Sequence, residues 1–60
     1  MKEVTLEVLA NIIEERKPLG LFYSQEGSRF VAVDNSQGEA WTEDFETIEQ
    51  VRNFLLGQED

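Results

Sequence analysis

Residues 29–34, Arg-Phe-Val-Ala-Val-Asp, form the clearest apolar run of the chain and have a turn signal on each side. Aromatic and β-branched residues of this kind are enriched in strands. The flanking segments 24–27 and 35–38 each end in glycine, and each fits a three-residue hairpin loop whose last residue is left-handed. The pattern predicts a central strand over residues 29–34, paired with outer strands over residues 19–24 and 39–43.

These two loops also set an expected register. Closing the first loop on its glycine places Phe22 opposite Phe30, and closing the second places Val33 opposite Trp41. Side chains alternate between the faces of a strand, so the register assigns each residue to a face. One face would carry Leu19, Leu21, Val31, Val33 and Trp41, and the other Gly20, Phe22, Phe30, Ala32, Ala40 and Thr42. We expect the first face, with Trp41, to be core; a slip of one residue in either loop would exchange the two sets.

A helix is expected before the sheet, over residues 6–16. Thr5 is a suitable N-cap, and apolar residues recur after it at helical spacing, at Leu6, Leu9 and Ile13. Pro18 ends this pattern, because it disfavours helical geometry at the preceding residue and has no backbone N–H.

A second helix is expected after the sheet. Thr47 followed by Gln50 is the Thr-x-x-Gln pattern of a capping box, and Ile48, Val51 and Leu55 then share one stripe. Glycine at position 57 is suited to end the helix. The acidic segment 43–46 that precedes Thr47 is expected to be a connection rather than a strand.

The order α-β-β-β-α predicts one small α+β domain over residues 1–60, a three-stranded antiparallel meander with an N-terminal and a C-terminal helix in two layers. The second sheet face, which carries Phe22 and Phe30, could be used in two ways. One helix could pack into its small residues, so that the sheet lies between the helices, or the face could stay open for another chain. The sequence leaves both alternatives open.

Composition narrows the function mainly by exclusion. Thirteen acidic and five basic residues give a formal net charge of −8, which opposes direct binding to nucleic acid or to an anionic membrane. With no cysteine and no histidine, disulfides, the usual zinc sites and thiol or imidazole catalysis are excluded. No apolar run approaches the ~20 residues of a membrane span. We expect a cytoplasmic protein without a cofactor, a metal site or a catalytic site, and therefore not an enzyme.

Phe22, Phe30, Ala32 and Ala40 are the candidate interaction face. In the expected register they lie together on the second sheet face, and a chain of 60 residues buries only about 60% of its unfolded surface. The hypothesis is a small acidic protein-interaction domain that binds a protein partner or a second copy of itself, with a homodimer joined through these residues as one form.

Glu43, Asp44, Glu46 and Glu49 form the candidate acidic surface. The alternative function built on them is an acidic inhibitor that mimics nucleic acid and occupies the groove of a DNA- or RNA-handling protein. A simpler explanation is that acids before and within the first turn of a helix are favoured by the helix dipole. The oxygen-rich segment 34–39 has some features of a calcium loop, but turn preferences of aspartate, asparagine and glycine account for it.

One stretch of sequence resembles a known class of protein. Residues 34–51, Asp-Asn-Ser-Gln-Gly-Glu-Ala-Trp-Thr-Glu-Asp-Phe-Glu-Thr-Ile-Glu-Gln-Val, combine a tight turn, a tryptophan-bearing strand and a threonine-capped helix. In this they look like small uncharacterised acidic proteins of bacteria and their phages or mobile elements. The resemblance covers under half of the chain and implies no functional residue.

Overall fold

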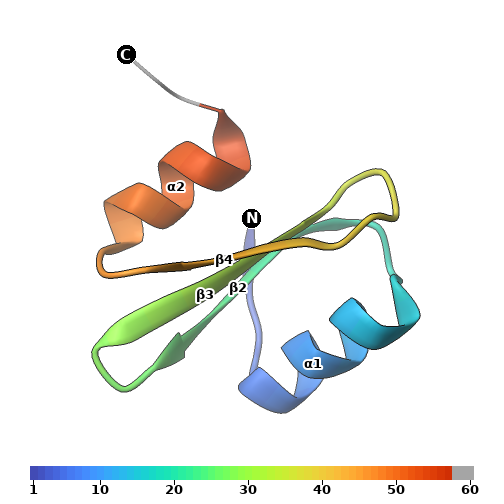
Figure 1. Cartoon of the computed structure of the whole chain (residues 1–60), viewed down its shortest axis with the longest axis horizontal. Helices are drawn as coiled ribbons and strands as arrows, with labels where there is room; N and C mark the ends of the chain where they lie inside the picture. Colours follow the sequence, from blue (N-terminus) through green and yellow to red (C-terminus); the bar gives the residue numbers. More distant parts are fainter. Residues whose placement is uncertain (58–60) are drawn as a thin grey trace.

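The computed structural model describes residues 1–57 and shows a four-stranded sheet with a helix on each side (Figure 1). The strands lie in the order β1-β2-β3-β4. The elements in chain order are β1 (Lys2–Glu3), α1 (Leu6–Glu15), β2 (Gly20–Glu26), β3 (Arg29–Asn35), β4 (Trp41–Phe45) and α2 (Ile48–Leu56). The α+β class is confirmed, and the last three residues of the expected domain, 58–60, lie outside the described part.

Strand β1 is an addition to the expected meander. It pairs parallel with β2, whereas β2, β3 and β4 are antiparallel, so the sheet is mixed. The segment β1-α1-β2 is therefore a short crossover unit in which α1 joins two parallel neighbours. Two polar residues give no readable alternation, which is why the sequence pattern did not reveal β1.

Both predicted helix starts are confirmed. The Thr5 hydroxyl accepts a hydrogen bond from the Val8 N–H at 3.1 Å, and the capping box of Thr47 and Gln50 is complete at the start of α2. Helix α1 ends at Glu15, one residue earlier than expected, because Arg16 adopts the left-handed conformation of a C-cap with φ 60°.

The first hairpin differs from the expected one in loop length. Only Gly27 and Ser28 lie outside the ladder, and Glu26 pairs with Arg29. Gly27 has φ +63° and Ser28 does not have positive φ, the pattern of a two-residue type II′ turn with glycine at its first central position. A type II′ turn matches the right-handed twist of the flanking strands and requires glycine at the position that Gly27 occupies.

This change moves β2 along β3 by an odd number of residues. Phe22 lies opposite Val33, three residues beyond the predicted partner Phe30. In the second hairpin the shift is one residue, because Trp41 lies opposite Asp34 and not Val33. An odd shift places the side chains of one strand on the opposite face relative to its neighbour. Because both hairpins are shifted by an odd number, the predicted sets of residues on each face are wrong.

The correct register gives the sheet two apolar faces, and each is covered by one helix. On the first, Phe22 and Val33 are buried with Leu9 and Ile12 of α1. On the second, Ala32 is buried with Val51 and Leu55 of α2. Figure 1 shows the sheet between the two helices, so the predicted two-layer arrangement is wrong and the alternative of a sheet between helices holds.

Phe22 also explains the glycine at position 20. Its ring covers Gly20, where an added Cβ would lie only 3.1 Å from Phe22 Cζ. Gly20 additionally has φ +144°, a conformation that other residues rarely adopt. Glycine at position 20 therefore leaves the space that the Phe22 ring occupies.

Within residues 1–57, no helix is both long and apolar enough to cross a membrane.

Replacing Phe22 with Ala should lower the free energy of unfolding by about 3–5 kcal/mol, because it removes a ring buried between α1 and the sheet. Trp41→Ala, the matched removal of an exposed ring, should change it by about 0.5 kcal/mol or less. Urea unfolding followed by far-ultraviolet circular dichroism measures both. Equal losses for the two variants would contradict the face assignment.

Candidate functional site

Strand β4 is a free edge of the sheet. It pairs with β3 on one side, and among the described residues no strand pairs with its other side. Residues 41–44 are exposed and only Phe45 is partly covered. The strand extends through the acidic segment that the sequence pattern assigned to a connection, because backbone pairing with β3 outweighs the low strand preference of glutamate and aspartate.

The direction of the backbone groups in the sheet can be derived from one hydrogen bond. The Val4 N–H donates to the Tyr23 carbonyl at 2.9 Å, so the backbone polar groups of Tyr23 face β1. In an antiparallel ladder the residues alternate between the two sides of the strand. Phe22 and Ser24 therefore face β3, where they pair with Val33 and Val31.

The same alternation continues across β3. Val31 and Val33 face β2, so Ala32 between them faces β4, where its partner is Glu43. The neighbours of Glu43, which are Thr42 and Asp44, then direct their N–H and C=O groups to the free side of β4. Two residues of β4 thus direct four backbone groups to a side of the strand where residues 1–57 offer no strand partner.

Two large apolar side chains are exposed at the end of the sheet where β2 and β4 begin. Leu19 is 65% and Trp41 is 64% exposed, more than any other large apolar residue described. Trp41 pairs with Asp34, which pairs with Leu21, so Trp41 lies on the α2 side of the sheet but beyond the core that α2 covers. The expectation that Trp41 is core is wrong.

Asn35 holds the backbone immediately before each of these two apolar residues. Its side chain is fully buried, and its Nδ2 donates to the Pro18 carbonyl at 2.8 Å. Its Oδ1 accepts from the Ala40 N–H at 3.1 Å. Leu19 follows Pro18 and Trp41 follows Ala40, so one buried carboxamide fixes the starting points of both exposed residues.

Further contacts order the same junction. The Trp41 Nε1–H donates to the Glu39 carboxylate at 2.8 Å, which ties the exposed ring to its own strand entry. Leu19 lies against the loop between β3 and β4, since its Cδ2 is 3.8 Å from a Cβ built on Gly38. Ala40 adopts φ 53°, so the chain turns sharply just before β4 begins.

The predicted acidic residues are all exposed, but they do not form one cluster. Glu43 pairs with Ala32 on the α2 side, and Asp44 pairs with Val31 on the α1 side. Glu46 and Glu49 lie beyond β4, in the connection to α2 and in the first turn of α2. Within residues 1–57 no group of three or more acidic side chains is arranged to hold a metal ion.

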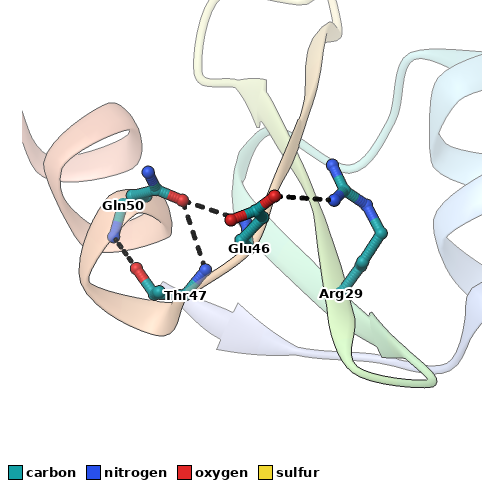
Figure 2. A network of polar contacts seen from close by, with 4 residues as sticks. All are labelled: Arg29, Glu46, Thr47 and Gln50. Carbon is teal, nitrogen blue, oxygen red and sulfur yellow. Dashed lines mark hydrogen bonds and ion pairs between the residues drawn. The ribbon is translucent and has the colours of Figure 1, made fainter.

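Figure 2 shows how the end of β4 is joined to α2. The Gln50 Oε1 accepts from the backbone N–H groups of Glu46 at 2.9 Å and Thr47 at 3.2 Å, while the Thr47 hydroxyl accepts from the Gln50 N–H. Arg29 Nη1 lies 3.5 Å from the Glu46 carboxylate across the sheet. This pair is exposed and adds little stability, but it offsets one acidic charge.

The candidate calcium-like segment forms a local turn. The Asp34 carboxylate accepts from the Ser36 N–H at 3.1 Å and from the Ser36 hydroxyl at 2.7 Å. This is the Asx geometry that the turn explanation predicts.

The predicted interaction face is not a surface. Phe22 and Ala32 are buried, and they belong to opposite sides of the sheet. Ala40 packs on the α1 side with Phe22, and Phe30 packs on the α2 side with Ala32. The four residues therefore cannot meet one partner, and the reason is the odd register shift in each hairpin.

The exposed pair of Leu19 and Trp41 was missed by the sequence analysis, although one signal was present. Thr42, Glu43 and Asp44 are consecutive polar residues, which a strand buried on either face would not have. Such a run indicates a strand exposed on both faces, and hence an edge. Asn35 gave no comparable signal, because asparagine before a turn is also common on surfaces.

Comparison of the chain with models of protein families, with curated proteins and with solved structures gave no match.

Replacing Asn35 with Ala should lower the free energy of unfolding by about 1–3 kcal/mol, because the Pro18 carbonyl and the Ala40 N–H both lose their partner. Ser36→Ala removes an exposed hydroxyl one residue away and should cost about 0.5 kcal/mol or less. Chemical unfolding measured by circular dichroism compares the two. A loss for Ser36→Ala as large as that for Asn35→Ala would contradict the proposed role of Asn35.

Proposed function

We propose that this chain is a small acidic protein-interaction domain without enzymatic activity, and that it binds through the surface formed by Leu19, Trp41 and the free side of β4. This surface is called the Trp41 surface below. The observation that supports it is the exposure of the Trp41 ring, which is 64% accessible although it lies on the same side of the sheet as the core beneath α2. Tryptophan is among the residues most enriched at the centres of protein interfaces.

The order around Trp41 supports the same function. A solvent-exposed ring usually loses freedom when it binds, which reduces affinity. Here the Glu39 carboxylate already holds the indole N–H, and Asn35 already holds the preceding backbone. The Trp41 surface is therefore partly organised before a partner arrives.

The acidic nucleic-acid mimic has weaker support. A mimic needs its charges in a row on one surface, whereas Glu43 and Asp44 lie on opposite sides of the sheet. Glu46 is moreover paired with Arg29. An acidic domain with an apolar centre agrees better with a partner that is itself a protein.

Self-association is one form of the proposed function, but it would use the Trp41 surface. The residues first considered for a homodimer are packed under the chain's own helices. A second copy would have to contact Trp41 and Leu19.

Affinity capture with the immobilised protein tests the proposal. Trp41→Ser should lose the partners that the unchanged protein retains from a lysate of the source organism. Val8→Ser is the matched control, because Val8 is a 43% exposed apolar residue on α1, and it should retain them. Bound proteins are compared by quantitative mass spectrometry. Partners that survive Trp41→Ser, or that Val8→Ser loses instead, would contradict the proposal.

A further inference from the structure

We infer that the Trp41 surface binds an extended, basic peptide segment, which adds to the sheet as a fifth strand beside β4. This inference rests on the proposed interaction function and specifies its partner. Addition of a strand to an exposed sheet edge is a recurrent mode of peptide recognition, in which backbone hydrogen bonds give affinity and side chains give specificity.

The backbone of β4 meets the first requirement of this mode. Thr42 and Asp44 direct their N–H and C=O groups to the free side, and the strand runs over five residues. The opposite edge of the sheet, β1, has only two residues. Among the described strands, β4 therefore offers the longer free edge.

The negative charge around β4 favours a peptide that carries basic residues. Residues 39–51 contain five acidic residues and no basic one. A second copy of β4 would place acidic side chains against acidic side chains, which is unfavourable for directly opposed residues in a sheet. Acidic side chains commonly protect edge strands from self-pairing, and the same charges attract a strand that carries lysine or arginine.

The side chains of β4 also assign a face to the basic residues. Trp41 and Glu43 lie on the α2 side, where Asp34 is the cross-strand neighbour of Trp41. Thr42 and Asp44 lie on the α1 side. A lysine or arginine on the α2 side of the added strand would meet both a carboxylate and an aromatic ring, which attracts cations. The basic side chains of the partner therefore belong on the α2 side.

A capped octapeptide of alternating lysine and valine is the probe. It should bind the unchanged protein, and its affinity should fall about tenfold when the salt concentration is raised from about 50 to 500 mM. The matched peptide of alternating lysine and proline has the same charge, but with its lysines on the α2 side it places proline, which has no N–H to donate, at the positions that bond to Thr42 and Asp44. It should bind at least about tenfold more weakly. Isothermal titration calorimetry measures both.

Two matched variants test whether the basic residues of the peptide lie on the α2 side of the sheet. Glu43→Gln and Asp44→Gln each remove one negative charge from neighbouring exposed positions, but on opposite sides of the sheet. Glu43→Gln should weaken binding of the lysine-valine peptide by about tenfold, and Asp44→Gln by about twofold or less. The reverse order would overturn the assignment of the basic residues to the α2 side.

A third variant tests whether the backbone of β4 forms hydrogen bonds to the peptide. Thr42→Pro removes one N–H that faces the free side and leaves the bonds between β4 and β3, so it should fold and lose peptide binding. Amide hydrogen exchange gives the same information without a substitution that could disturb folding. The Thr42 and Asp44 amides should exchange freely in the protein alone and slow by about tenfold or more with saturating peptide.

The outcomes separate this inference from the proposed function. Equal binding of the two peptides, or no slowing at Thr42 and Asp44, would overturn strand addition, while capture of partners that depends on Trp41 would leave the interaction function intact. Slowing of these amides with rising protein concentration and no peptide would identify a second copy as the occupant and would overturn the basic peptide.

Discussion

The two-residue turn at Gly27 and Ser28 is the constraint on which the rest of the structure depends. It makes Glu26 the partner of Arg29 and thereby sets every pair between β2 and β3. Because side chains alternate with a period of two, an odd offset in this hairpin moves a whole strand to the other face. Phe22 is consequently buried beneath α1, and the second face is left to α2.

The consequences extend to the surface. Each helix packs on one face of the sheet, and α2 reaches β4 only at Phe45, so residues 41–44 remain exposed. Asn35 then joins the two loops at one end of the sheet and fixes the backbone from which Leu19 and Trp41 project. The interior and the candidate site are thus linked, since a buried carboxamide in β3 positions the exposed apolar pair.

Local signals in the sequence predicted the elements well and their mutual arrangement poorly. Thr5, the Thr47-Gln50 capping box and Gly57 act within a few residues of themselves, and each is confirmed in the structure. The register was wrong because the segment Ser-Gln-Glu-Gly-Ser fits both a three-residue and a two-residue loop, and only the twist and packing of the whole sheet decide between them.

The error in register had its largest effect on the predicted interaction site. The predicted pairing of Phe22 with Phe30 implied an open aromatic face and assigned Trp41 to the core. In the structure Phe22 is buried and Trp41 is exposed. The acidic residues were recognised as exposed, but their division between the two sides of β4 follows from the pairing of Glu43 with Ala32 and could not be read from spacing alone. The class of function, a protein-interaction domain, stays a proposal, now supported by a different surface.

The pairing of the strands is the claim that a single measurement tests most directly. In an antiparallel ladder, residue pairs without mutual hydrogen bonds bring their Cα atoms to about 4.5 Å, close enough for strong nuclear Overhauser effects between Hα protons. The structure predicts such effects for Tyr23 with Ala32 and for Val33 with Thr42. A strong Hα–Hα effect between Leu21 and Val31 in their place would restore the three-residue loop and contradict the account.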